Sequence, residues 1–87
     1  MRIYMQTPYI PPNPMRFYHL HLQKDLLGGW TLVRESGPQG GRGQLTKTHF
    51  DSWDAAEAAM IKFRDAQIKR GYRVVFREGQ PSISENG

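Results

Sequence analysis

The feature that most constrains the fold is an alternation of apolar and polar residues early in the chain. Residues 18–23 (YHLHLQ) place a tyrosine or leucine at every second position, which is the period of a strand with one buried face. Residues 30–35 (WTLVRE) and 44–50 (QLTKTHF) are also rich in aromatic and β-branched residues, the types favoured in strands. Because short, glycine-containing segments join the three, they predict an antiparallel meander.

The period changes to that of a helix after residue 50. Asp51 and Ser52 are N-cap candidates, and Gly71 is a stop signal preceded by two basic residues. An apolar stripe at spacings of three and four lies between these signals: Ala56, Ala59, Met60, Phe63 and Ala66. A helix over residues 52–70 should therefore pack against one face of the sheet.

These patterns predict one α+β domain, a small antiparallel β-sheet of three or four strands with one α-helix packed on one face. The fourth strand is residues 72–77 (YRVVFR), expected at an edge of the sheet. Prolines at positions 8, 11, 12 and 14 remove backbone donors, so residues 1–14 are expected to form an extended arm. The domain then spans residues 15–77, and residues 78–87 form a polar tail.

The composition narrows the functional classes. The 87 residues include no cysteine, which excludes disulfides, thiolate metal sites and a cysteine nucleophile. No apolar run approaches the length of a membrane span, and prolines interrupt the start of the chain where a signal peptide would be apolar. We therefore expect a cytoplasmic protein with no membrane partner. A net charge of +4 and a pI near 9.8 permit a polyanionic partner such as nucleic acid.

The residues that could carry chemistry do not form a catalytic or metal-binding pattern. His19 and His21 share a strand face and His49 could approach them, but a structural zinc site needs four ligands. The serines, histidines and carboxylates show no spacing that indicates a triad. We therefore expect no enzyme activity, no cofactor and no metal. Trp30 and Trp53 are expected to pack in the core.

Several motifs occur in a fixed order between Asn13 and Tyr72. They are Arg16-Phe17-Tyr18, Gly28-Gly29-Trp30 followed by Leu32-Val33-Arg34-Glu35, a loop ending in Gly40-x-x-Gly43-Gln44, FDSWDAAEAAMIKF, and Lys69-Arg70-Gly71-Tyr72. In this order and spacing they resemble the WGR domain, specifically its short stand-alone bacterial form. The resemblance implies a DNA-binding module, because WGR domains inside poly(ADP-ribose) polymerases bind DNA at strand breaks.

The tripeptide that names this family has changed in the chain. Alignment on the G-x-x-G-Q motif places Ser36, Gly37 and Pro38 where the family has Trp-Gly-Arg. In the family the tryptophan packs against the terminal nucleotide and the arginine supports nearby backbone contacts. Serine has no stacking face, and proline has neither a charge nor an amide donor, so these two roles do not carry over to Ser36 and Pro38.

Two interpretations of the glycine-rich segment 36–43 remain open. The segment opens onto a strand rather than a helix, so it matches neither a P-loop nor a dinucleotide-binding fingerprint. Gly37-Pro38-Gln39-Gly40 suits a turn with proline in its second position, and Gly41 and Gly43 suit positive φ. The segment is therefore either a structural connection or a ligand-contacting loop.

The candidates for contact with nucleic acid lie in and around this loop: Arg34, Ser36, Arg42, Gln44 and Lys47. Arg42, between two glycines, is the best placed to reach a phosphate. Arg34 and Lys47 are expected on one side of the sheet, in a basic cluster with Arg42. Ser36 could donate a hydrogen bond to a phosphate oxygen. The alternative is that these are ordinary solvent-exposed groups and that Ser36 bonds within the turn.

The leading hypothesis is a non-catalytic module that binds nucleic acid, either DNA backbone or DNA ends, weakly and without sequence specificity. The basic helix end at Lys69 and Arg70 is a further candidate surface for phosphate contact. The alternative is a protein-interaction or self-associating module that has lost the DNA site. In that case Tyr4, Tyr9 and Ile10 of the arm would dock on the sheet edge of a partner or of a second copy.

Overall fold

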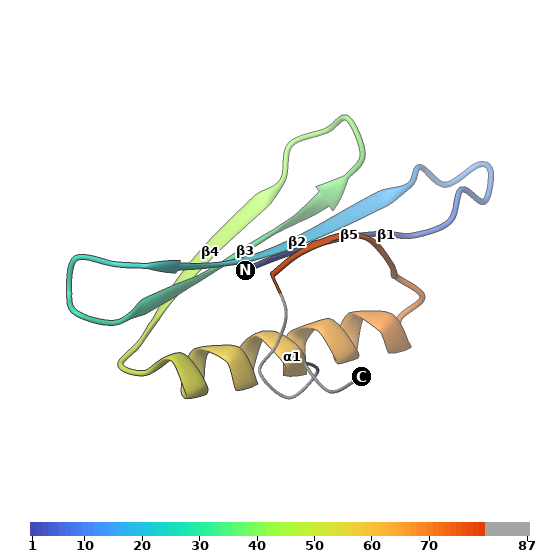
Figure 1. Ribbon diagram of the computed structural model, residues 1–87. Coiled ribbons are helices and arrows are strands. Elements are labelled where there is room, and N and C mark those ends of the chain that lie inside the picture. The colour runs from blue at the N-terminus through green and yellow to red at the C-terminus, as the bar shows by residue number, and fades with distance from the viewer. Residues whose placement is uncertain (80–87) are drawn as a thin grey trace.

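The computed structural model describes residues 1–79, which form a five-stranded antiparallel sheet with one helix packed on it (Figure 1). The elements in chain order are β1 (Arg2–Gln6), β2 (Arg16–Lys24), β3 (Trp30–Pro38), β4 (Gln44–Phe50), α1 (Trp53–Lys69) and β5 (Arg73–Glu78). The strand order across the sheet is β4-β3-β2-β1-β5. The predicted α+β class, the strand at residues 44–50 and the edge position of the last strand are confirmed.

The first strand corrects two expectations. Residues 2–6 do not belong to an irregular arm, because β1 pairs with both β2 and β5. Ile3 and Met5 are fully buried, while the residues between them face the other side of the sheet. The prolines begin only at Pro8, so they leave this short alternation intact. The sheet consequently has five strands rather than three or four, and of the expected arm Met1 and residues 7–14 lie outside the strands.

Strand β3 is longer than predicted and includes the segment aligned with the family tripeptide. Ser36 lies opposite Tyr18, and Pro38 lies opposite Arg16, in the register of β2 with β3. The turn comes one residue later than expected, because the N–H of Gly41 donates to the carbonyl oxygen of Pro38 (3.0 Å). Gly40, not Gly41 or Gly43, has positive φ (+78°). The β3–β4 loop is therefore residues 39–43.

Helix α1 begins and ends close to the predicted positions. The Ser52 hydroxyl caps its first turn by accepting a hydrogen bond from the N–H of Ala55 (3.1 Å). Its buried residues include Ala56 and Met60, which meet the inward side chains of the sheet. The buried apolar core is Ile3, Met5, Tyr18, Leu20, Leu22, Leu32, Ala56 and Met60. Within residues 1–79, no helix combines the length and apolar character needed to cross a membrane.

The two tryptophans pack where the sheet meets the start of the helix. The rings of Trp30 and Trp53 meet edge to face with centroids 4.8 Å apart, and both pack against the core. This confirms the packing role expected for them.

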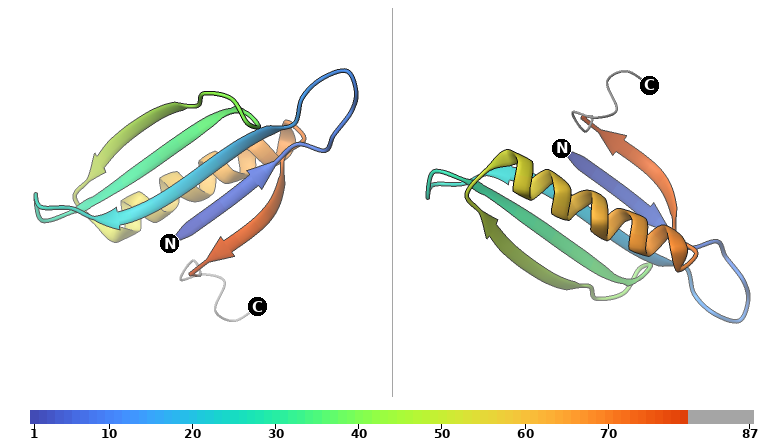
Figure 2. Two further views of the ribbon diagram at one scale, coloured as in Figure 1. Left: turned by 90° about the horizontal axis from the view of Figure 1, so that it is seen from above. Right: turned by 90° about the horizontal axis from the view of Figure 1, so that it is seen from below.

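The helix covers only one face of the sheet, as the views from above and below show (Figure 2). On the other face, the rings of Tyr4, Phe17, His19 and His21 form a continuous row with centroid separations of 5.8–6.2 Å. Burial, followed by the positive charge of Arg2, lowers the pKa of His19 and of His21. Both imidazoles therefore favour the neutral form, and Arg2 supplies the positive charge beside this aromatic row.

We expect Leu20→Ala to destabilise the domain by about 2–5 kcal/mol, because it removes methyl groups from a fully buried site between sheet and helix. Leu45→Ala is the matched control, since that side chain is 55% exposed and its loss should change stability by no more than about 0.5 kcal/mol. Urea denaturation followed by circular dichroism measures both. Similar losses for the two variants would contradict the placement of the core.

Candidate nucleic-acid interface

Three segments distant in sequence meet at one end of the molecule. They are the start of β2 and the C-terminal end of α1, both toward the right of Figure 1, and the β3–β4 loop, which rises above them on the same side. The loop is joined to β2 because the N–H of Gln39 donates to the carbonyl oxygen of Met15 (2.7 Å). We call this part of the surface the basic end, because it carries Arg16, Arg42 and Arg70, all three exposed.

Two adjoining open cavities lie at the basic end. The smaller, of about 290 Å³, is lined by Thr7, Arg16, Tyr18, Ser36, Gln67, Arg70 and Tyr72. The larger, of about 470 Å³, shares Thr7, Arg16 and Arg70 and is otherwise lined by Pro8, Ile10, Asn13, Pro14 and Gly71. All these lining residues fall within the described chain and none is a carboxylate. The two guanidinium groups therefore border a hollow with hydroxyl groups in its wall and no nearby acidic side chain lining it.

Backbone hydrogen bonds fix the positions from which the two arginines project. The N–H of Thr7 donates to the carbonyl oxygen of Arg16 (2.9 Å), and the N–H of Arg16 donates to Oγ1 of Thr7 (2.9 Å). Arg70 is the C-cap of α1, and its N–H donates to the carbonyl oxygen of Gln67 (3.0 Å). Gly71 follows with φ of +102°, which ends the helix beside the cavity. Fixed backbones under exposed guanidinium groups suit the binding of an anion.

A side chain of the β3–β4 loop anchors it to the open face of the sheet. Oε1 of Gln39 accepts hydrogen bonds from the hydroxyl of Tyr4 (3.3 Å) and from Nε2 of Gln6 (3.1 Å). Gly37 and Gly43 allow the close approach of the two strand ends, because a Cβ on Gly37 would lie 2.9 Å from the carbonyl oxygen of Arg42. The loop that carries Arg42 is thus a tight, anchored connection, and its arginine side chain extends into solvent.

Comparison with protein families gives one match, to the WGR domain, over residues 1–79. The chain belongs to the WGR domain family. The match covers every strand and the helix, including β1, and WGR domains in general are nucleic-acid-binding modules. Neither a search of curated proteins nor a search of solved structures found a match.

The structure of this WGR domain places some of the predicted site residues together and separates others. Ser36 lines the smaller cavity, and Gln44 lies directly opposite it in the register of β3 with β4. Arg42 lies in the loop at the same end. These three keep a position from which they could contact a ligand at the basic end.

Arg34 and Lys47 do not form the predicted cluster, because they lie on opposite faces of the sheet. Lys47 pairs with Val33 and Arg34 pairs with Thr46, and neighbouring residues of a strand point to opposite sides. Arg34 lies on the helix face, with its guanidinium 4.1 Å from the centre of the Phe63 ring. Its Nε is buried and has no hydrogen-bond partner within residues 1–79. Arg34 therefore packs the helix against the sheet by a cation–π contact.

Sequence reasoning missed Arg16 and Thr7, which line both cavities of this WGR domain. It also did not predict that Arg70 lies beside these two residues. Arg16 was visible only as part of a family motif, and Arg70 belonged to a candidate basic helix end that no pattern placed beside Arg16. Their proximity depends on the pairing of β1 between β2 and β5, which turns the segment 7–15 back toward the end of the helix. No local pattern contains that information.

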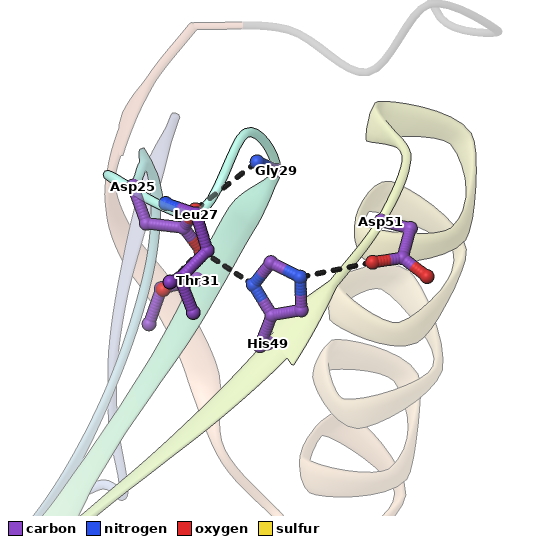
Figure 3. Close-up of polar contacts among 6 residues, drawn as sticks. All are labelled: Asp25, Leu27, Gly29, Thr31, His49 and Asp51. Atoms are coloured by element: carbon purple, nitrogen blue, oxygen red, sulfur yellow. Dashed lines mark hydrogen bonds and ion pairs between the residues drawn. The ribbon is translucent and has the colours of Figure 1, made fainter.

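The opposite end of this WGR domain carries an acidic cluster around His49 (Figure 3). Nδ1 of His49 lies 2.7 Å from Oδ2 of Asp25, and Nε2 lies 3.0 Å from Oδ1 of Asp51. Asp25 also accepts hydrogen bonds from the N–H groups of Leu27 and Gly29 and from the Thr31 hydroxyl. A histidine with a carboxylate at each ring nitrogen can satisfy both only when it is protonated.

The pKa values of His49 and Asp25 shift in opposite directions. The hydrogen bonds to Asp25 and then to Asp51 raise the pKa of His49. Partial burial raises the pKa of Asp25, but the hydrogen bonds from His49, Thr31, Gly29 and Leu27 together outweigh it and lower the pKa to about 2. The cluster therefore joins the β2–β3 turn to the start of α1 and does not resemble a metal site with His19 and His21.

We expect the stabilising effect of His49 to depend on pH. Because the pKa of His49 is higher in the folded state, its ion pairs stabilise the fold fully below pH 6.5, the ordinary pKa of histidine. This stabilisation is lost as the pH rises through the folded-state pKa of His49. Because the pKa of Asp25 is lower in the folded state, its carboxylate stabilises the fold above pH 3.8. That stabilisation is lost as the pH falls toward 2. The difference in melting temperature between the wild type and His49→Gln should therefore be largest between these limits and shrink on both sides.

Thermal unfolding over a pH series measures this difference, and His21→Gln is the control. The pKa of His21 is lowered, so loss of that imidazole should not produce the same maximum. A difference for His49→Gln that stays constant with pH would show that the ion pairs do not form.

Proposed function

We propose that this WGR domain is a non-catalytic module that binds the phosphate backbone of DNA through its basic end. The observation that carries the proposal is the pair of arginines, Arg16 and Arg70, on the rim of a hollow lined by no acidic side chain. Guanidinium groups match phosphate oxygens in geometry and charge. Arg42, on the neighbouring loop, extends the same positive surface.

Hydroxyl groups within the hollow add neutral donors to this positive rim. Ser36, Thr7 and Tyr72 line the smaller cavity between the two arginines, and hydroxyl groups commonly donate to phosphate oxygens in protein–DNA complexes. Ser36 occupies the position of the family tryptophan, and a ring at this position would fill the cavity instead of lining it. The change of motif therefore exchanges a stacking surface for a space that a phosphate can enter.

The charge distribution along the molecule favours approach from this end. Asp25, Asp51 and Asp54 lie around the start of α1, at the end opposite the arginines (Figure 1). The helix dipole runs in the opposite sense, but it acts only within the last turn and is outweighed there by the full charge of Arg70 and Lys69. A polyanion is thus attracted to one end and repelled from the other.

Binding of this kind should be weak, sensitive to salt and indifferent to base sequence, because phosphate contacts release counterions and contain no base information. Preference for a DNA end over an intact duplex would follow if the hollow accepts a terminal phosphate group. Both properties belong to the proposal and both can be measured in one titration.

We expect Arg16→Ala and Arg42→Ala each to weaken duplex DNA binding and to reduce the slope of log affinity against log salt by about one. Lys24→Ala is the matched control: it removes a positive charge from the far end of the strand that begins with Arg16. Fluorescence anisotropy with a labelled duplex at several salt concentrations gives both quantities. Intact and broken duplexes of the same sequence test for end preference.

The titration separates the possible failures. If Lys24→Ala lowers affinity as much as Arg16→Ala does, binding follows net charge rather than the basic end. If the wild type does not bind duplex DNA at low salt, the nucleic-acid assignment is wrong.

A protein-binding role is the second candidate, favoured by the exposure of the arm. Tyr9 and Ile10 are 65% and 62% exposed on a short turn closed by a bridge between Ile10 and Asn13. Tyr4 is not part of such a surface, because it lies in β1 and its hydroxyl is bonded to Gln39. Tyr9→Ser changes no residue that lines either cavity, so it would abolish protein capture and leave DNA binding intact if this role is separate.

A further inference from the structure

Strand β5 is the most exposed apolar segment of the sheet. Val74, Val75 and Phe76 follow one another and are 43%, 58% and 47% exposed. Their strand is the last in the order β4-β3-β2-β1-β5, so within residues 1–79 its outer edge pairs with nothing. An edge strand with free backbone groups and apolar side chains is a template for the addition of another strand.

The opposite edge of the sheet shows what a protected edge looks like in the same molecule. Strand β4 carries Lys47 at its centre, between Thr46 and Thr48, and charged or polar residues on an edge discourage pairing. Strand β5 also carries charges, but Arg73, Arg77 and Glu78 lie toward its ends and its central residues, Val74 to Phe76, are apolar. An apolar centre flanked by charges of both signs favours pairing at β5 over pairing at β4.

The helix does not shield β5. Helix α1 packs mainly against β2, β3 and β4, and the views along the vertical axis show β5 on the uncovered side beyond β1 (Figure 2). The strand is therefore accessible at its outer edge and on both faces. A partner could extend the sheet here without displacing any described element.

The side chains of β5 are arranged to pair with a second copy of the same strand. Its register with β1 skips Val75, so that Arg73, Phe76 and Glu78 lie opposite Gln6, Tyr4 and Arg2. These partners alternate along β1 and share one face of the sheet. The opposite charges of Arg73 and Glu78 therefore lie on that face, at the two ends of the strand, with Phe76 midway in the paired sequence.

We propose that the chain forms a two-fold symmetric dimer in which β5 pairs antiparallel with β5 of a second copy. Pairing centred on Phe76, with Val75 of each copy left out of this ladder as it is left out of the ladder with β1, sets Arg73 of each copy opposite Glu78 of the other, and the symmetry forms this ion pair twice. Glu78 then lies between Arg2 of its own chain and Arg73 of its partner. The two sheets join into one, and the basic ends point in opposite directions along it.

This pairing is independent of the nucleic-acid proposal. It uses no residue of the basic end, and it leaves both cavities open because β5 begins after Tyr72. Failure of DNA binding therefore says nothing about the dimer, and a monomer could still bind DNA.

Sedimentation of the full-length chain tests the dimer directly. Over about a hundredfold range of protein concentration, the weight-average mass should rise from 10.1 kDa toward twice that value. A mass that stays at that of one chain throughout would overturn the proposal.

A charge-reversal experiment then tests the register. Arg73→Glu and Glu78→Arg each replace two attractive pairs by two repulsive pairs, so each variant alone should self-associate about tenfold more weakly than the wild type. An equimolar mixture of the two should form a heterodimer, because each contact then joins opposite charges again. Recovery in the mixture also shows that neither variant is merely unfolded.

Lys47→Glu, on the opposite edge, is the matched control and should leave the association unchanged. If both reversals leave the dimer intact, or if the mixture associates no better than the separate variants, the interface is not β5 in this register. If only Lys47→Glu breaks the dimer, the partner strand is β4.

Discussion

The pairing of β2 with β3 along their whole length is the constraint on which the rest of the structure depends. It points Leu20, Leu22 and Leu32 at the helix, which gives α1 an apolar surface to cover. The same register ends with Arg16 opposite Pro38 and Tyr18 opposite Ser36. A slip of one residue would turn the leucines to solvent and move Ser36 away from the hollow. The core and the candidate site are thus fixed by one set of backbone hydrogen bonds.

Sequence patterns predicted the parts of the fold that depend on local order. The alternation in β2, the cap at Ser52 and the glycine at position 71 each act within a few residues, and each appears in the structure where the pattern placed it. What the patterns did not contain was the pairing of the first strand with the last. The five residues of β1 are too short for a strong periodic signal, and the prolines that follow favoured an irregular arm.

The same limit explains the mixed outcome for the site. Arg42 and Ser36 were identified from their place in a loop and a motif, which are sequential features. Whether Arg34 and Lys47 share a face depends on the register between two strands, and a shift of one residue reverses the answer. Arg34 is instead held over Phe63. Arg16 and Arg70 come together only through the order of the whole sheet, so a single sequence cannot indicate their proximity.

The two ends of this small domain differ in charge, and its two edge strands differ in the distribution of apolar and charged residues. Along the strands, the carboxylates around His49 close one end by forming ion pairs within the chain, whereas the arginines at the other end border a hollow and face solvent. Across the strands, the β4 edge has a lysine at its centre, and the β5 edge has an apolar centre with Arg73, Arg77 and Glu78 toward its two ends. Association through that edge would not compete with a ligand at the arginines, because strand pairing uses the direction across the sheet and the basic end lies along it. A sheet extended in this way would present two basic ends far apart, and so could hold two nucleic-acid segments with a weak contact at each, where simultaneous engagement strengthens the total.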